Sequence, residues 1–551
     1  MRAMILSSLL CAISLGLAGC NDDSPSDPID VKIIAFNDFH GNLKTPSGGV
    51  KTPDPADASK TVTVPAGGAE YLATWIASLK AKNPNNIVVS AGDLIGASPL
   101  LSALFHDEPT IESMNLMGLD INAVGNHEFD EGKDELLRMQ NGGCHPVDGC
   151  QAGSTFGGAK FKFLAANVVD TQSGKTIFPA YVIKTFHRVP VAFIGMTLKG
   201  TPSIVTPSGV AGLTFKDEAD TVNALVPELK KQGVEAIVVV LHEGGYQSGF
   251  YNDCKGISGP LVDIVNHLDP AVDVVISGHT HQAYNCNIGG KLVTSAGQYG
   301  TLVSEIDLKL NPSTHDVVES KADNLIVRTT VAKDPQQTSL IDRLLTLVTP
   351  LENRIVGTVT TLLDRGQNAA GESPLGDIIA DAQLEATTAA SFGGAQIALM
   401  NPGGIRANIT PDAAGKVTYG MLFTVQPFGN SLVTMTLKGA DVREALEQQW
   451  KGQSSPRILS VSKGFNYSWD NAAPVGSKIV SITLNGVPLD PAASYRVTVN
   501  NFLSTGGDNF VAFNKGTNRL GGAQDVDALE AYFKAHTPVA PLASDRVSRL
   551  N

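Results

Sequence analysis

The sequence predicts an α/β fold that is divided between at least two domains. Short apolar runs rich in β-branched residues recur up to about residue 310, and segments with helical periodicity lie between some of them. This alternation is typical of a domain that buries a β-sheet under helices. A chain of 551 residues also exceeds what one hydrophobic core accommodates, so two or three domains are expected.

The first part of the chain contains a series of runs that we expect to be buried strands. They cover residues 31–36, 86–90, 121–124, 162–168, 191–196, 236–241, 272–277 and 291–296. Two intervening segments, 69–82 and 218–233, place apolar residues at the spacing of one helix face. The pattern therefore predicts helices there, packed against the sheet that the strands form.

Residues 333–356 predict a mostly helical connector, interrupted near Pro350 because proline removes a helical hydrogen bond. We place the domain boundary inside it, so that the first domain covers 30–332 and the second 357–551. In the second domain we expect a helix, a strand and two paired strands, at about 374–388, 396–401, 431–439 and 477–489. The last segment contains Asn485-Gly486, which is a hairpin signal.

The N-terminal twenty residues resemble a bacterial export signal. One arginine precedes an apolar stretch, residues 4–17, which is too short and too weakly flanked for a transmembrane helix. The stretch ends in "LAGC", like a lipoprotein cleavage site. We therefore expect a signal peptide over 1–20, a lipid on Cys20 and a polar tether over 21–29. The protein would then be exported, periplasmic or at the cell surface, and held to the membrane only by its lipid. An ordinary signal peptide with a chance cysteine is the alternative.

Four further cysteines remain in the exported chain, at positions 144, 150, 254 and 286. In an oxidising compartment an even number favours disulfides, and four cysteines allow three connectivities. We favour the pairs that are local in sequence, Cys144 with Cys150 and Cys254 with Cys286. A zinc cluster is the alternative, although none of the four lies in a C-x-x-C motif.

The charge of the chain limits its partners. The formal net charge is −13, which disfavours a nucleic acid polymer because such binding requires a basic surface that releases counterions. Small anionic substrates are not excluded, since bound metal ions can reverse the local field.

Five of the expected strands are each followed directly by a polar motif. The motifs are "NDFHG", "GD", "GNHEFD", "HEGG" and "GHTH", and they carry Asp38, His40, Asp93, Asn126, His127, His242, His279 and His281. Ligands of open α/β sheets bind at the carboxyl ends of the strands. Each motif alone is more typical of a turn, but together they bring imidazole, carboxylate and amide groups to one edge. This mixture suits two divalent ions of the Zn, Mn, Fe or Co class.

In this order the motifs resemble the signature of calcineurin-like metallophosphoesterases. From about residue 31 to 540 the chain is similar to the family of bacterial 5′-nucleotidases and UDP-sugar hydrolases. The resemblance implies a four-layer α/β/β/α sandwich for the first domain. It implies an α/β domain with a mixed sheet, which selects the nucleotide, for the second.

The resemblance also assigns the metal ligands. One ion would be held by Asp38, His40 and His281, and the second by Asn126, His242 and His279. Asp93 would bridge the two ions. Such a pair binds phosphate oxygens and activates a bridging hydroxide for attack on phosphorus.

The motif "GNHEFD" carries more than a metal ligand. By resemblance, His127 contacts a phosphoryl oxygen or the leaving group, and Asp130 holds its imidazole in place. We expect Glu128, which stands between them, to be structural.

The substrate residues are expected in the second domain. "NPGGIRA" supplies Asn401, which would reach the base, and Arg406, which would clamp phosphate. Phe428 and Phe502 would sandwich the nucleobase, and Asp508 would bind the ribose hydroxyls. Because these residues follow the connector, the site should be complete only when the two domains face each other.

One departure from the family leaves the substrate open. Relatives that bind nucleoside monophosphates carry additional arginines near residues 371–382, where this chain has Gly371 and Asp377; Arg365 is a nearby candidate replacement. The leading interpretation is hydrolysis of nucleoside 5′-monophosphates. UDP-sugars or 2′,3′-cyclic nucleotides are the alternative substrates. A surface protein that only binds nucleotides is disfavoured, because all seven expected ligands and the His127–Asp130 pair are present.

Overall fold

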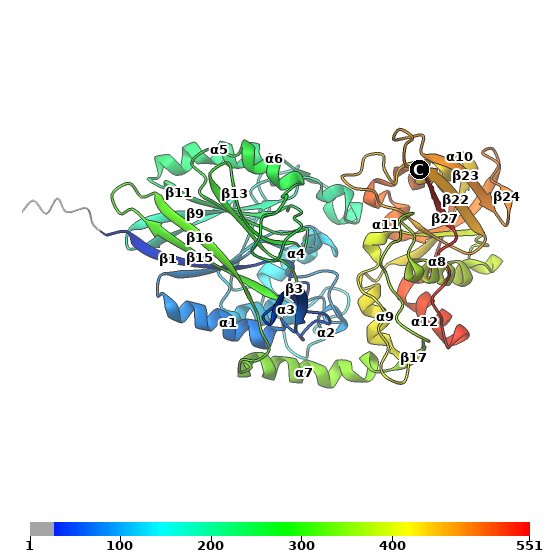
Figure 1. The fold of residues 1–551 in the computed structure, drawn as a ribbon, viewed down its shortest axis with the longest axis horizontal. Helices are drawn as coiled ribbons and strands as arrows, with labels where there is room; N and C mark the ends of the chain where they lie inside the picture. Colours follow the sequence, from blue (N-terminus) through cyan, green and yellow to red (C-terminus); the bar gives the residue numbers. More distant parts are fainter. Residues whose placement is uncertain (1–26) are drawn as a thin grey trace, which may run out of the picture.

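A computed structural model describes residues 27–551 (Figure 1). The expected signal peptide, Cys20 and most of the tether lie outside these residues. Within the described part of the chain, each helix is too short or too polar to cross a bilayer. The first half of the chain, residues 29–326, and the second half, 355–550, form two bodies, and a long helix runs below the first body and reaches the second (Figure 1).

The first half contains two six-stranded sheets. One has the order β16-β15-β1-β4-β5-β6 and the other β13-β14-β12-β11-β9-β8. The strands of the first sheet are β1 (Ile29–Phe36), β4 (Asn86–Ser90), β5 (Ile121–Ala123), β6 (Lys162–Leu164), β15 (Leu302–Leu310) and β16 (Val317–Ile326). Those of the second are β8 (Tyr181–Phe186), β9 (Val189–Thr197), β11 (Ala236–His242), β12 (Val274–Ser277), β13 (Ala283–Ile288) and β14 (Lys291–Ala296).

Alternate residues of the central strands face two different cores. Ile33 of β1 belongs to the apolar core between the two sheets, together with Val238 of β11. Its neighbour Ile34 points the other way and packs in a core with the helices that cover the first sheet. Those helices are α1 (Ala69–Lys82), α2 (Leu100–Ala103), α3 (Glu108–Met117) and α4 (Lys133–Asn141). Helices α5 (Glu218–Lys231) and α6 (Pro260–His267) cover the second sheet. The four-layer α/β/β/α prediction is confirmed.

The strands expected in the first half are present, except that the run 162–168 is divided between β6 and a separate short strand, β7 (Val168–Asp170), and α1 and α5 occupy the segments expected to be helical. The sequence did not indicate the hairpin of β2 (Val50–Asp54) and β3 (Asp57–Val64), nor the long strand β16. These strands contain many exposed polar residues, so they lack the continuous apolar run that marks a buried strand.

The connector is the helix α7 (Pro335–Glu352), capped by Asp334, whose side chain accepts from the backbone N–H groups of Gln336 and Gln337. The expected interruption near Pro350 was wrong, because the helix continues to Glu352. Pro350 lies in the last turn, where it removes a single backbone donor. Leu344 and Val348 of α7 are buried in the core of the first half, so the helix packs against that half.

The second half is built on a mixed sheet of order β21-β18-β25-β20-β26 and a four-stranded sheet of order β24-β23-β22-β27. The strands are β18 (Ile397–Met400), β20 (Ser431–Lys438), β21 (Ser460–Val461), β22 (Phe465–Asp470), β23 (Ile479–Leu484), β24 (Val487–Pro488), β25 (Ser494–Asn500), β26 (Thr517–Gln524) and β27 (Val547–Leu550). Its main helices are α8 (Pro374–Thr387), α9 (Tyr419–Val425), α10 (Gly439–Glu447), α11 (Asn501–Ser504) and α12 (Asp525–His536).

One expected pairing in this half was wrong. The segments 431–439 and 477–489 do not pair with each other, because β20 lies between β25 and β26 while β23 pairs with β22. Both segments have the period of a strand, but that period does not specify a partner. The hairpin at Asn485-Gly486 is present and joins β23 to β24.

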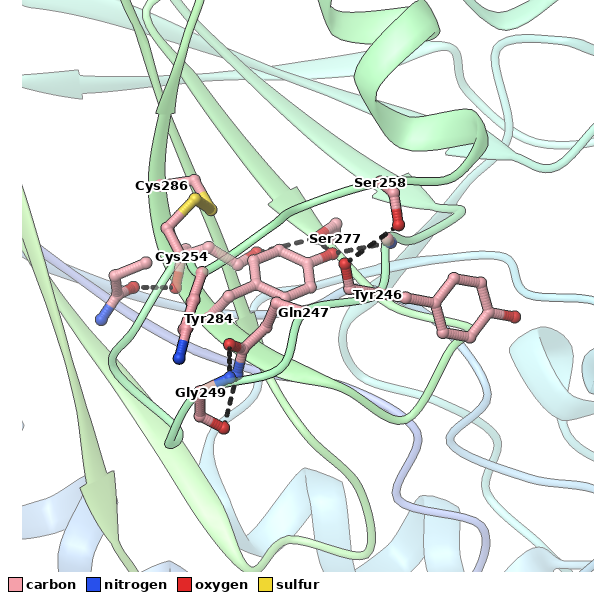
Figure 2. Close-up of a disulfide and its surroundings, with 12 residues drawn as sticks. Tyr246, Gln247, Gly249, Cys254, Ser258, Ser277, Tyr284 and Cys286 are labelled. Carbon is pink, nitrogen blue, oxygen red and sulfur yellow. Dashed lines mark hydrogen bonds between the residues drawn. A yellow bond between two sulfur atoms is a disulfide. The ribbon is translucent and has the colours of Figure 1, made fainter.

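The structure joins Cys144 to Cys150 and Cys254 to Cys286. Figure 2 shows the second disulfide, which ties the loop after β11 to strand β13, with Tyr284 beside it. The Tyr284 hydroxyl lies 2.8 Å from Ser277 Oγ and accepts from the N–H of Gly245. The disulfide and the hydrogen bond from Gly245 to Tyr284 therefore both anchor this loop, close to His242 at the end of β11.

Candidate functional site

The carboxyl ends of five strands bring the expected ligands together. Asp38 and His40 follow β1, Asp93 follows β4, and Asn126 follows β5 in the first sheet. His242 ends β11 in the second sheet, and His279 and His281 follow β12. All but His279 and His281 are at most 2% exposed. The two sheets therefore meet at one buried polar centre, as the motif order predicts.

Asp93 lies at the middle of this centre. Its Oδ2 is 3.1 Å from Nε2 of His242 and 3.6 Å from Nε2 of His40. Its Oδ1 accepts from the backbone N–H of His127 at 2.9 Å. One carboxylate oxygen thus faces imidazoles from both expected ligand sets, which is the geometry that a bridging ligand requires.

The two ligand sets lie on either side of Asp93. On one side Nε2 of His281 is 3.2 Å from Nε2 of His40 and 3.4 Å from Oδ1 of Asp38. On the other side Oδ1 of Asn126 is 3.1 Å from Nε2 of His242, and the donor atoms of Asp93, His242 and His279 lie within 4.8 Å of one another. Lone pairs that converge this closely repel unless a cation lies between them, so the donor set fits a divalent metal ion on each side.

Backbone carbonyls orient two of the imidazoles. Nδ1 of His40 donates to the carbonyl of Gly96 at 2.8 Å, and Nδ1 of His242 donates to that of Ala91 at 2.7 Å. Because these carbonyls can only accept, the proton stays on Nδ1 and the lone pair of Nε2 faces the centre. Metal-ligating histidines are held by this kind of outer contact.

The backbone is strained at these positions. Five of the seven expected ligands have left-handed backbone torsions: φ is 49° at Asp38, 45° at His40, 50° at Asp93, 70° at His279 and 56° at His281. Residues other than glycine adopt this region rarely, and such strain clusters at functional sites. Residue type and spacing do not reveal it.

Burial controls the charge of the imidazoles. It lowers the pKa of His279 to about 3 and that of His40 well below 6.5, so both are neutral, as metal ligands must be. Burial also lowers the pKa of His242, but the Asp93 carboxylate outweighs this effect and raises the pKa to about 10. The centre carries two buried carboxylates. Protonated His242 supplies the positive charge that a bound cation would otherwise supply there.

His127 and Asp130 form a pair beside the centre. Nδ1 of His127 lies 2.8 Å from Oδ2 of Asp130. Burial opposes protonation of His127, but the charges of Asp130 and Asp93 raise its pKa above 6.5. The carboxylate therefore fixes the proton on Nδ1 and the orientation of the ring, in line with the role expected of Asp130.

Glu128 holds the loop that carries Asp93. Its buried carboxylate accepts from the backbone N–H groups of Asp93, Leu94 and Gly125 at 2.7–3.0 Å, and from the amide of Asn122 at 3.2 Å. Burial raises its pKa to about 7. These contacts agree with the structural role expected from the sequence, and they make Glu128 a positioning residue for Asp93.

Replacing Glu128 by glutamine should loosen this loop. The side-chain NH₂ group would point at backbone N–H donors, leaving one or two of them unpaired in the interior, at a cost of about 1–3 kcal/mol each. We expect a lower melting temperature and about 10- to 100-fold weaker metal affinity. Thermal unfolding and metal titration measure both, with the exposed Glu319→Gln as the matched control. Unchanged metal affinity would contradict the positioning role.

A cavity of about 240 Å³ lies between the two halves of the chain, next to the expected metal ligands Asn126 and His279. From the first half it is lined by Asn126, His127, Asp130 and His279, and from the second by all five expected substrate residues, Asn401, Arg406, Phe428, Phe502 and Asp508. The structure thus brings the expected substrate residues to the expected catalytic pair.

Phe428 crosses the boundary between the halves. Its ring stacks on the imidazole of His127, with 5.8 Å between centroids and an interplanar angle of 19°. The guanidinium carbon of Arg406 lies 5.8 Å from the same ring. An aromatic face and a cation therefore flank His127 on the side of the cavity.

The cavity is also lined by residues that the motifs did not indicate: Ile204, Val205 and Thr206 from the first half, and Asn430, Arg457 and Asn500 from the second. Arg457 supplies a second arginine, and it lies in "SSPRIL", where no glycine-rich motif marks it. Arg365, the candidate replacement, instead donates to the backbone carbonyl of Ile405. Asp377 is buried in α8, where burial raises its pKa to about 9.

A second cluster of histidines and carboxylates is an ion-pair network. Both ring nitrogens of His106 contact carboxylates, Glu131 at 2.7 Å and Asp148 at 2.9 Å, and His145 stacks on its ring. These carboxylates, Glu131 first, raise the pKa of His106 to about 9. The positive charge of protonated His106 explains why these carboxylates gather around its ring.

Comparisons with known proteins match each half of the chain to a family. Residues 31–283 match the family described as calcineurin-like phosphoesterase, and residues 355–515 match the 5′-nucleotidase C-terminal domain. A crystal structure of a 5′-nucleotidase precursor from Thermus thermophilus superposes with a TM-score of 0.77. It is 27% identical, and the match covers 95% of this chain and 100% of that one.

Two curated relatives match almost the whole chain. Endonuclease YhcR of Bacillus subtilis (strain 168) is 34% identical over 528 residues, which cover 95% of this chain but only 41% of the relative. Cell wall protein Lmo0130 of Listeria monocytogenes serovar 1/2a is 32% identical over 557 residues, which cover 93% of this chain and 68% of the relative. The chain therefore spans less than half of the first relative and about two thirds of the second.

Proposed function

Since the chain belongs to the family of calcineurin-like metallophosphoesterases that carry a 5′-nucleotidase C-terminal domain, we propose that it hydrolyses nucleoside 5′-monophosphates to nucleosides and phosphate. Membership makes it a phosphoesterase hydrolase of the 5′-nucleotidase type. The observation that carries the choice of substrate is the shared cavity, where His127 and Asp130 face two arginines and two phenylalanines from the other half.

The metal centre supplies the charge for this reaction. We propose that Asp38, His40 and His281 hold one divalent ion, that Asn126, His242 and His279 hold a second, and that Asp93 contacts both. Ions held there would bind phosphate oxygens and lower the pKa of an adjacent water. The neutral state of His40 and His279 supports this assignment, since only the neutral imidazole offers a lone pair.

His127 stabilises the charge that develops during transfer. Its Nδ1 proton is committed to Asp130, so Nε2 is the nitrogen available to the phosphoryl group or the leaving oxygen. In the protonated state, which both carboxylates favour, Nε2–H donates a hydrogen bond to that oxygen and then its proton to the leaving alkoxide.

The second half selects and orients the substrate. Arg406 lies beside Phe428 and lines the same cavity as His127, where its guanidinium can bind phosphate oxygens in a bidentate manner. Phe428 and Phe502 line the cavity and offer aromatic faces to a nucleobase. Offset stacking contributes about 0.5–1.5 kcal/mol beyond the burial of apolar area.

We also propose that the protein is exported and carries a lipid on Cys20. Its two disulfides fit an oxidising compartment, and one relative is described as a cell wall protein. The net charge of −13 supports a nucleotide over a nucleic acid polymer as substrate.

A substrate panel tests the function. Phosphate release should be faster from AMP than from UDP-glucose or 2′,3′-cyclic AMP, with p-nitrophenyl phosphate as a generic phosphoester. A chelator should abolish release, and Mn, Co or Zn should restore it. A preference for the UDP-sugar or the cyclic nucleotide would select an alternative of the same family, and release that survives complete metal removal would exclude the two-metal mechanism.

A further inference from the structure

Four side chains outside the proposed metal centre bring together donor atoms of the kind that divalent ions bind. They are His106, Glu131, Glu135 and His145, and one donor atom of each lies within 4.8 Å of the other three. They come from three segments: the loop before α3, the start of α4 with the turn that precedes it, and the loop that the Cys144–Cys150 disulfide closes. We call these four residues the His106 cluster.

Asp148 orients the imidazole of His106. Its Oδ2 lies 2.9 Å from Nε2 of His106, while Oε2 of Glu131 lies 2.7 Å from Nδ1 of the same ring. When Asp148 holds the proton on Nε2, the lone pair of Nδ1 points toward Glu131. A carboxylate that holds the remote ring proton is a common outer partner of a metal-bound histidine. Asp148 therefore prepares His106 to bind a cation between Nδ1 and Glu131.

The charges around the cluster also favour a cation. Arg138 donates to both oxygens of Glu135 at 2.6–2.8 Å, which orients that carboxylate and still leaves lone pairs on it. Glu131 and Asp148 face the ring of His106 instead, and a proton on that ring supplies one positive charge between them. A divalent ion in place of this proton supplies two positive charges, which matches the two carboxylates.

A small cavity next to the cluster is lined by a buried carboxylate that has an unpaired oxygen. The cavity, of about 70 Å³, is lined by His106, Asp107, Glu131 and Glu135 among others. Oδ2 of Asp107 accepts from the backbone N–H of Gly96 at 2.9 Å, but its buried Oδ1 has no hydrogen-bond partner within residues 27–551. Buried carboxylate oxygens rarely stay unpaired. A water molecule on a cation held by His106 and Glu131 would supply the missing donor.

The donor set selects zinc over the hard cations. Two imidazoles and two carboxylates provide the four ligands of a tetrahedral zinc site, whereas Ca²⁺ and Mg²⁺ prefer oxygen ligands. The ring of His145 stacks on that of His106 with 3.8 Å between centroids, so the two imidazoles are already adjacent. The side chain of Glu131 is 46% exposed and can rotate to close the remaining distance.

We propose that His106, Glu131, Glu135 and His145 bind one Zn²⁺ ion, which ties together the three segments that carry them. The inference goes beyond the proposed function and does not depend on it. Because Glu131 directly follows Asp130 in the chain, the ion would hold the segment behind the His127–Asp130 pair. The exposed side chain of Glu131 lets the ion exchange with solvent. We therefore expect a dissociation constant on the order of 1–10 μM, weaker than that of closed zinc sites.

Zinc uptake by the full-length protein tests the inference. Bound ions are counted by elemental analysis after equilibrium dialysis at a free Zn²⁺ concentration about tenfold above the expected dissociation constant, and again after exhaustive dialysis into metal-free buffer. The variants are His145→Ala, Glu131→Gln and Asp93→Asn. His536→Ala is the matched control, because His536 forms an exposed histidine–carboxylate pair, with Nε2 2.8 Å from Glu385.

The wild type should bind one ion more at this Zn²⁺ concentration than it retains after exhaustive dialysis. His145→Ala and Glu131→Gln should lose this additional ion, since removal of a ligand weakens binding by more than the about 10- to 100-fold that an outer partner contributes. Asp93→Asn and His536→Ala should keep it. Zn²⁺ should also raise the melting temperature of the wild type by about 2–5 °C more than that of His145→Ala.

Several results would overturn the inference. Equal uptake by the wild type, His145→Ala and Glu131→Gln would show that the cluster holds ion pairs only. Loss of the additional ion in Asp93→Asn would assign that ion to the metal centre, and its loss in His536→Ala would show binding at unrelated surface histidines.

Two further measurements keep the test decisive. If His145→Ala does not fold, Glu131→Gln decides, since it keeps the size of an exposed side chain. An equal concentration of Ca²⁺ should leave the additional ion in place, because an imidazole is a poor ligand for Ca²⁺. Displacement of the ion by Ca²⁺ would overturn the assignment of the two histidines as ligands.

Discussion

Replacement of Asp93 by asparagine should reduce phosphate release from AMP by on the order of 10³-fold or more. Asp93 Oδ2 faces imidazoles of both ligand sets, at 3.1 Å from His242 and 3.6 Å from His40. An amide in its place removes a negative charge and turns one ligand atom into an N–H donor. Both ions should bind more weakly, so the metal content should fall below two ions per chain.

This experiment measures metal content and kcat/KM together. Asp134→Asn, an exposed change on α4, is the control and should retain both values. Far-UV circular dichroism shows whether the variant is folded. Asp93→Asn with full metal content and full turnover would show that Asp93 does not contact both ions. Loss of a single ion would show that it binds one of them only.

Replacement of His127 by alanine should lower kcat by about 10²- to 10⁴-fold, the range for removal of a general acid or a charge-stabilising donor. The metal content should stay unchanged, because the His127 side chain is not one of the proposed ligands. This contrast with Asp93→Asn separates a catalytic residue from a metal ligand. His267→Ala, on the exposed end of α6, is the matched control. An alanine variant with wild-type turnover would remove His127 from the mechanism.

The variant Asp130→Asn tests whether the charge of Asp130 raises the pKa of its partner His127. In the wild type, the charges of Asp130 and Asp93 keep the pKa of His127 above 6.5, so the imidazole remains protonated to a higher pH than usual. Loss of the Asp130 charge should lower this pKa. If protonated His127 is the active form, the fall of kcat on the alkaline side should then begin at a lower pH. A pH profile with an unchanged alkaline limb would contradict this assignment.

The clustering of the expected metal ligands could be predicted because these residues follow local rules. Each expected ligand comes at the end of an apolar strand or directly after it, and the carboxyl ends of parallel strands share one edge of a sheet. The order of "NDFHG", "GD", "GNHEFD", "HEGG" and "GHTH" therefore placed seven side chains that the structure then brought together. The left-handed backbone of five of them had no counterpart in the sequence pattern.

Strand pairing in the second half could not be predicted from the sequence. The period of β20 identifies a strand, yet its partners β25 and β26 come much later in the chain. A short apolar period carries no information about register or neighbour. The interruption expected at Pro350 failed for a related reason, since the effect of a proline depends on how much of the helix follows it.

The two-part α/β fold, the order of the motifs and the His127–Asp130 pair could be predicted from residue patterns alone, because these features depend on residues that are close together or that each end a strand. The stacking of Phe428 on His127 and the ion pair of Arg457 with Asp508, 51 positions away, became evident only in the folded molecule. Such contacts depend on how distant segments pack against each other, and local residue patterns do not encode that packing.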